Sequence, residues 1–197
     1  KPLKKIADAF EGLNASASSK TSIEVDSFSY ACAQVSVLFG CLGMAFKFAE
    51  KDYTSKVEDL IVASKSISTL QSLVDLDVQH NSVRNGGSHS RNLLRVIRGL
   101  DMVRVLFEQI LLSQGNSLRD PASVAYAKVF APHHGWAIRK AVGAGLYALP
   151  SKSQLLRKLN EDEASAKVQM QKYVTSSGPV IRYVEELFLS QELGIDW

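Results

Sequence analysis

Apolar residues recur every three to four positions along most of the chain, which is the spacing of amphipathic α-helices. Strand-like alternation bounded by turn residues is rare, and the five prolines stand near the ends of these apolar stretches. The pattern predicts helices at roughly 3–15, 27–39, 42–62, 65–80, 88–113, 121–130, 134–147, 151–159 and 161–190. We expect the last helix to be interrupted near Pro179, because proline lacks a backbone N–H. The pattern predicts an all-α fold.

Turn residues separate these stretches. "NGGS" at 85–88 predicts a turn with Ser88 as the N-cap of the next helix, and "NEDE" at 160–163 predicts Asn160 in the same role. "SQGNSLRDP" at 113–121 is the clearest loop, and it places Pro121 at a first helical position. We find no internal repeat, low-complexity segment or long linker, so residues 1–197 are predicted to form a single domain.

Composition narrows the class of protein. With 46% hydrophobic and 22% charged residues, the chain has the balance of a globular domain rather than a disordered one. A net charge of +3 is too small to indicate nucleic acid as a partner, and no apolar run reaches the ~18 residues of a membrane span. Cys32 and Cys41 are predicted to be buried thiols of a reducing compartment. The first ten residues lack the apolar core of a signal peptide, so we predict a cytoplasmic protein.

One face of the predicted 88–113 helix changes character along its length. Arg91, Arg95 and Arg98 are spaced i, i+4, i+7 and therefore share a face. The same face continues with apolar residues, namely Met102, Val105 and Leu106. A separate stripe already carries the water-facing charges, namely Asp101, Arg104 and Glu108. The arginines either pair with acidic side chains of a neighbouring helix or hold an anion, for which the planar guanidinium is well suited.

Two further groups of polar residues carry candidate chemistry. Asp52 and Lys56 lie one helical turn apart, where an intrahelical ion pair is the simplest interpretation. His133 and His134 precede Gly135 and Trp136, but adjacent histidines lack the i, i+4 spacing of helical metal ligands. No carboxylate or cysteine lies near them in the sequence, so we predict no metal site.

Together these groups resemble the glycolipid transfer protein family. Three motifs appear in the family's order: Asp52 in "DYTSK", "LLRVIRGL" at 93–100 and "HGW" at 134–136. The similarity continues through "AIRKAVGAGLYALP" at 137–150. The resemblance implies an all-α, two-layer helical sandwich of about eight helices, with an apolar interior for lipid chains and the headgroup at the surface. It implies a carrier without cofactor rather than an enzyme.

Two positions within these motifs bear on the headgroup. Family members that bind sugar lipids have an asparagine four residues after the aspartate and a tryptophan directly after the two leucines. Lys56 and Arg95 stand there in this chain, and an ammonium and a guanidinium suit phosphate rather than a neutral sugar. The resemblance therefore implies the ceramide-1-phosphate branch, with Lys56, Arg91 and Arg95 on the phosphate and Arg98 at most peripheral.

The resemblance also implies roles for the remaining motif residues. Asp52 would accept from the ceramide amide N–H and His134 would donate to the amide carbonyl, with His133 as the rival donor. Trp136 would touch an anionic membrane surface transiently, unless its indole packs into the core. We expect a peripheral, reversibly bound monomer and no nucleic-acid partner. The alternatives are a neutral glycosphingolipid carrier and a helical interaction protein without ligand.

Overall fold

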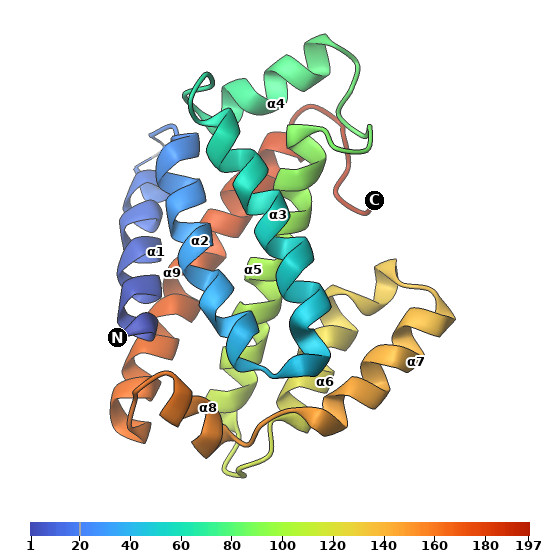
Figure 1. Ribbon diagram of the computed structural model, residues 1–197. Coiled ribbons are helices and arrows are strands. Elements are labelled where there is room, and N and C mark those ends of the chain that lie inside the picture. Colours follow the sequence, from blue (N-terminus) through green and yellow to red (C-terminus); the bar gives the residue numbers. More distant parts are fainter. Residues whose placement is uncertain (20) are drawn as a thin grey trace.

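The computed structural model describes residues 1–19 and 21–197, and all helices and loops named below lie in these ranges. Apart from an isolated β-bridge between Glu24 and Thr69, every regular element there is helical (Figure 1). The α-helices are α1 (Pro2–Ser18), α2 (Val25–Cys41), α3 (Lys47–Ala63), α4 (Leu70–Gln79), α5 (His89–Leu112), α6 (Arg119–Val129), α7 (Trp136–Gly145), α8 (Lys152–Lys158) and α9 (Glu163–Leu189). Short 3₁₀ turns η1 (Met44–Phe46), η2 (Ala131–His133) and η3 (Leu146–Ala148) complete this list. The all-α prediction is confirmed.

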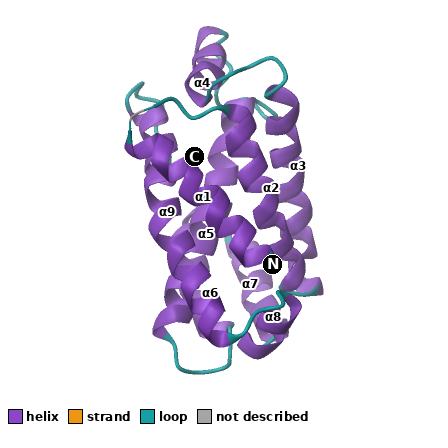
Figure 2. Cartoon of the chain, turned by 90° about the vertical axis from the view of Figure 1, so that its left-hand side faces the viewer, coloured by secondary structure: helices purple, strands orange, loops and turns teal. Residues whose placement is uncertain are grey.

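The helices form two packed layers. Helix α5 packs against α9 and α6, while the pair α2 and α3 covers α5 from the other side (Figures 1 and 2). Helix α1 runs along α9 and also contacts α2, so it closes one edge of the sandwich. Helix α4 lies at one end of the molecule and α8 at the opposite end. This arrangement is the expected two-layer helical sandwich.

An aromatic cluster joins three of these helices in the core. Tyr173 of α9 makes edge-on contacts with Phe10 of α1 and Phe107 of α5, with ring centroids 5.1 and 5.6 Å apart. All three rings are buried. The Tyr173 hydroxyl donates to the carbonyl of Leu100 at 2.8 Å, which satisfies its polar atom inside the core. The cluster therefore fixes α5, the helix that carries the arginines.

Several helix boundaries differ from the sequence prediction. Ser88 is the N-cap of α5 as predicted, and its hydroxyl accepts from the N–H of Arg91. The cap of α9 is Asp162 instead of Asn160, because Asn160 adopts a left-handed turn conformation with φ of 55°. Helix α6 begins at Arg119, two residues before Pro121. The described residues form nine α-helices, where the resemblance implied about eight.

The predicted interruption at Pro179 was wrong. Helix α9 continues through this residue to Leu189. Proline removes one backbone donor, but the neighbours Ser177, Gly178 and Val180 are all buried, so packing on both sides of the proline holds the helix together.

Cys32 is buried and Cys41 is half-buried, and both are free thiols. The prediction of two buried thiols is therefore correct for Cys32 and only partly so for Cys41. None of the helices in the described ranges is long and apolar enough to cross a membrane.

Candidate functional site

A close contact between α3 and α5 positions the candidate residues. A Cβ atom built on Gly99 would lie only 2.9 Å from Cδ2 of Tyr53, so the two helices touch at this glycine. The Tyr53 ring cannot easily move aside, because its hydroxyl donates to the carbonyl of Cys32 at 2.7 Å and its ring packs on Phe39. Asp52 and Lys56 of α3 are consequently held beside the arginine-bearing segment of α5.

Lys56, Arg91 and Arg95 bring cations from two helices to one region. The Lys56 ammonium lies 2.5 Å from Oδ1 of Asp52, and the two side chains are 22% and 62% exposed. Arg91 and Arg95 are half-buried, and Arg91 donates to the carbonyl of Arg84 at 3.2 Å. Burial and the charge of Arg91 lower the pKa of Arg95, and the Asp52 carboxylate opposes that shift. Asp52 thus serves Lys56 as an ion-pair partner and acts on Arg95 through its charge.

Arg98 is the innermost cation, with 9% of its surface exposed. Its Nη2 atom donates to the carbonyl of Ile195 at 2.9 Å and also to a main-chain oxygen of Trp197. Burial and the nearby Arg95 lower its pKa to about 10, which leaves the guanidinium charged at neutral pH. Its Nη2 donor is directed at main-chain oxygens of the C-terminal residues.

The charge of Arg98 acts on both histidines of the "HHGW" stretch, His133 and His134. Burial, followed by the charge of Arg98, lowers the pKa of His133 and of His134, so both rings are neutral at pH 7. Nδ1 of His134 is hydrogen-bonded to the hydroxyl of Tyr126 at 2.7 Å, and its ring stacks on Phe130. His134 is half-buried while His133 is exposed. The better-fixed imidazole is therefore that of His134.

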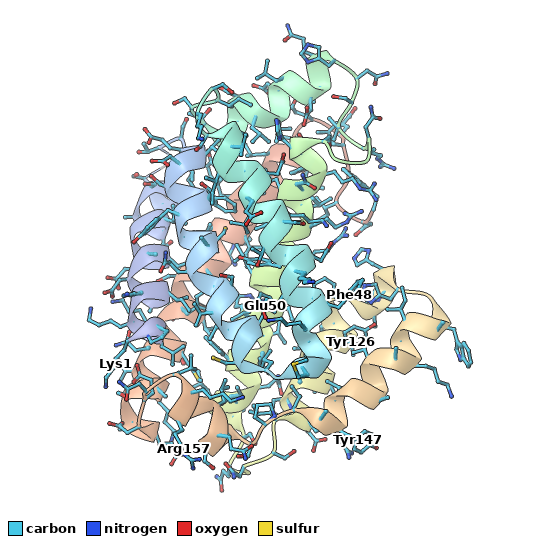
Figure 3. The ribbon with its side chains drawn as sticks, in the orientation of Figure 1. Lys1, Phe48, Glu50, Tyr126, Tyr147 and Arg157 are labelled. Carbon is cyan, nitrogen blue, oxygen red and sulfur yellow. The ribbon has the colours of Figure 1, made fainter. Side chains whose placement is uncertain are left out.

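Trp136 begins α7 and is 69% exposed, so its indole does not pack into the core. The Lys140 ammonium lies 5.2 Å from the centre of its ring. Phe48 at the start of α3 is also exposed, and Figure 3 places it on the side of the molecule where α3 approaches α6 and α7. Large apolar side chains are thus exposed on two elements that border the cation cluster.

The apolar part of the arginine face turns into the protein. Met102 is half-buried, and Val105 and Leu106 are buried among other core side chains. The face therefore runs from a partly exposed cationic end into the interior of the sandwich.

The structure brings together Asp52, Lys56, Arg91 and Arg95 as neighbouring groups. His134 is within range of the charge of Arg98, and Trp136 follows it by two residues. Sequence reasoning missed three contributors, which are Arg84, Tyr126 and Trp197. Arg84 and Trp197 come from loops distant in sequence from their partners and carry no local motif. In the described ranges no group of three His, Cys, Asp or Glu side chains is arranged to hold a metal.

A two-layer helical sandwich with a surface cation cluster that leads into an apolar interior has the features of a lipid-binding protein. The family model "Glycolipid transfer protein (GLTP)" matches residues 23–161. This match spans more than half of the chain, and the chain therefore belongs to the glycolipid transfer protein family.

Individual relatives match this chain over nearly their full lengths. "Accelerated cell death 11" of Arabidopsis thaliana is 61% identical across all of this chain and 97% of its own length. The crystal structure of an aspartate-to-alanine mutant of that Arabidopsis protein, complexed with C12 ceramide-1-phosphate, superposes with a TM-score of 0.98 over 100% of both chains. The apo-form of mouse ceramide-1-phosphate transfer protein, 24% identical, shares the fold with a TM-score of 0.86 over 97% of each chain.

Proposed function

We propose that this protein binds ceramide-1-phosphate and carries it between membranes as a monomer without covalent chemistry. The observation that carries this proposal is the convergence of Lys56, Arg91 and Arg95 at the point where an apolar helix face enters the core. A phosphate monoester has about 1.5–2 negative charges at pH 7 and three acceptor oxygens, which match cations with several N–H donors. The crystallised Arabidopsis relative, with ceramide-1-phosphate bound, supports the same ligand.

The ceramide amide is assigned to Asp52 and His134. Asp52 is the more exposed member of its ion pair, so one carboxylate oxygen is available to accept the amide N–H. In the neutral tautomer with hydrogen on Nε2, the Tyr126 hydroxyl donates to Nδ1 of His134 and leaves the Nε2–H to donate to the amide carbonyl. This bond to a phenol orients the imidazole for recognition, whereas a catalytic base is usually oriented by a carboxylate.

The lipid chains are assigned to the core beside α5. From Arg95 to Leu112 this helix is about 25 Å long at 1.5 Å per residue. One leaflet of hydrocarbon is about 15 Å thick, so the helix is long enough to shelter a chain. Exposing about 25 methylenes to water costs roughly 20 kcal/mol, which makes unassisted transfer negligible. Because Val105 and Leu106 are buried, the chains enter only when the packed side chains of this region part.

Headgroup and amide recognition together predict selectivity for ceramide-1-phosphate over phosphatidic acid. Phosphatidic acid offers the same phosphate and has ester carbonyls, but it has no amide N–H, so Asp52 loses its donor. Loss of a hydrogen bond to a charged group costs about 1.5–3 kcal/mol, and we expect at least tenfold weaker binding of phosphatidic acid. The measurement is competition between the two lipids for the protein, followed by native mass spectrometry of the bound species.

Galactosylceramide is the second competitor in this experiment, because it keeps the amide and replaces the phosphate by a neutral sugar. Preferential binding of galactosylceramide would show that the cation cluster does not select phosphate and would overturn the proposal. Equal affinity for phosphatidic acid and ceramide-1-phosphate would instead remove the role assigned to Asp52.

We further propose that Trp136 makes a reversible membrane contact. Its exposed indole and the neighbouring Arg139 and Lys140 suit an anionic headgroup layer. Trp136→Ala is expected to slow vesicle-to-vesicle transfer about fivefold, since partial burial of an aromatic side chain contributes about 1 kcal/mol. Lipid binding in solution should not change. Tyr147→Ala is the matched control, because Tyr147 is equally exposed but lies at the other end of α7 (Figure 3).

Tryptophan fluorescence tests the same contact directly. The chain has two tryptophans, so the spectrum of the unaltered chain minus that of Trp136→Phe isolates the emission of Trp136 while Trp197 keeps its contacts with Arg84 and Arg95. Addition of anionic vesicles to lipid-loaded protein should shift this emission to shorter wavelength. Unchanged emission would show that Trp136 is not the membrane contact.

A further inference from the structure

The last residues of the chain hold three of the arginines around the cation cluster. We call residues 193–197 the C-terminal strap. Arg84 donates to the carbonyl of Leu193 at 3.2 Å, and Arg95 donates to a main-chain oxygen of Trp197 at 2.7 Å. Arg98 donates to the carbonyl of Ile195 and to a main-chain oxygen of Trp197. The strap therefore presents main-chain oxygens to side chains from two other parts of the chain.

The strap has a defined conformation of its own. The Trp197 indole N–H donates to the carbonyls of Leu193 and Gly194 at 3.0 and 3.1 Å, which closes a turn. Gly194 has φ of 72°, a conformation that side-chain-bearing residues rarely adopt. The indole also contacts Phe188 of α9, with ring centroids 6.2 Å apart. Its carbonyl oxygens are thus held in place before they meet the arginines.

The Trp197 ring adds a second kind of contact. The guanidinium of Arg84 lies 4.9 Å from the centre of the ring, and that of Arg95 lies 5.7 Å from it. Arginine favours the face of an indole through cation–π attraction. The strap therefore places an aromatic ring beside the cation cluster, and this ring contacts the guanidinium groups of Arg84 and Arg95.

These contacts leave Arg95 able to bind an anion. A guanidinium has five N–H donors in a fixed plane, and the strap occupies a donor on Nη1. Because the hydrogen bond from Nη1 fixes one edge of the planar Arg95 guanidinium, the other N–H donors of this group can point in only a few directions. The strap matters more for Arg98 than for Arg95. Arg98 is buried beside another arginine, and its guanidinium donates to main-chain oxygens of Ile195 and Trp197 instead of to water. Asp196 in the same segment adds a negative charge that offsets part of this repulsion.

We propose that the C-terminal strap is a positioning element of the phosphate site, which orients Arg95 through a main-chain oxygen and the ring of Trp197 and keeps Arg98 in place behind it. The inference rests on the proposed binding of ceramide-1-phosphate. The opposite effect, in which strap carbonyls compete with phosphate for the arginines, predicts tighter binding when the strap is lost.

The test compares the full chain with a variant that lacks residues 194–197 and with Gly194→Val. The deletion removes the main-chain oxygens of Ile195 and Trp197 but leaves a new carboxylate on Leu193 beside Arg84. Gly194→Val avoids this new charge, because it keeps every other side chain and disfavours the turn. We expect each variant to bind short-chain ceramide-1-phosphate about tenfold more weakly, the loss of one charge-assisted hydrogen bond. Gly43→Val is the matched control, because Gly43 also has positive φ, at 93°, but lies in the connection before α3.

A thermodynamic cycle with Arg95→Leu separates positioning from general loss of structure. If the strap acts through Arg95, its deletion should cost less than about threefold in the Arg95→Leu background, because coupled residues are not additive. A full tenfold loss in both backgrounds would show that the strap does not act through Arg95 and would overturn the inference. So would unchanged or tighter binding by either folded variant. Failure of the unaltered chain to bind ceramide-1-phosphate would instead contradict the proposed function.

Discussion

Arg95→Leu is expected to reduce ceramide-1-phosphate transfer at least tenfold while the protein remains folded. Charge-assisted hydrogen bonds contribute about 1.5–3 kcal/mol each, and a loss of 1.4 kcal/mol is tenfold in binding. Arg95 is half-buried, so its contact with phosphate is less weakened by solvent than that of an exposed side chain. The leucine keeps the apolar stem and removes the guanidinium. Transfer of a fluorescent ceramide-1-phosphate between vesicles measures the rate.

Arg104→Leu provides the matched control on the same helix. Arg104 is paired with Asp101 at 2.8 Å and with Glu108 at 3.5 Å, away from the arginine face. The substitution is chemically identical, and these partly exposed ion pairs are expected to contribute about 1 kcal/mol to stability. We expect transfer by Arg104→Leu to stay close to that of the unaltered protein. Full transfer by folded Arg95→Leu would remove Arg95 from the phosphate site.

The fold was predictable because its main signal is local. The apolar spacing indicated the long helices α5 and α9 and the all-α class, since burial of one helix face imposes that periodicity. Errors fell where tertiary packing overrides a local rule. Pro179 would interrupt an isolated helix, but the buried residues beside it keep α9 continuous. Asparagine and aspartate are both good N-cap residues, so the sequence alone does not choose between Asn160 and Asp162. Asn160 adopts a left-handed backbone conformation, and Asp162 therefore caps α9.

The candidate site was predictable only as far as its residues carry motifs. Shared helix faces brought Asp52 near Lys56 and Arg91 near Arg95, because i, i+4 spacing fixes those neighbours. Spacing gives no information on contacts between segments far apart in the chain. The bond from Arg95 to Trp197 spans 102 residues and had no local signal. Exposure of Trp136 also depended on tertiary structure, and the alternative of a buried indole was wrong.

Gly99 illustrates how one residue connects fold and site. It belongs to the "RGL" motif, and the structure gives a physical reason for its lack of a side chain, because Tyr53 occupies the space where a Cβ would stand. Tyr53 in turn follows Asp52 directly on α3. The distance between α3 and α5 at Gly99 therefore sets the distance from the Asp52–Lys56 pair on α3 to the arginines on α5.

Gly99→Val is expected to destabilise the protein by about 3 kcal/mol, the upper end of the usual cost of over-packing a core. Valine gains little from helix propensity relative to glycine, so the clash with the Tyr53 ring dominates. Gly12→Val is the matched control, because Gly12 lies in α1 and nothing stands within 4 Å of its Cβ position. Urea unfolding measures the free energy of each variant, and Gly12→Val should lie within about 0.5 kcal/mol of the unaltered protein.

The clash with Tyr53 can be isolated by removing the ring. Tyr53→Ala destabilises the protein by itself, since it leaves a cavity and removes the side-chain hydrogen bond to the Cys32 carbonyl. In that background the valine at position 99 has room, so its additional cost should fall below about 1 kcal/mol. The difference between the two backgrounds is the energy of the helix contact. An equal cost of Gly99→Val with and without the Tyr53 ring would show that Gly99 is required for another reason and that the α3–α5 approach does not depend on this pair.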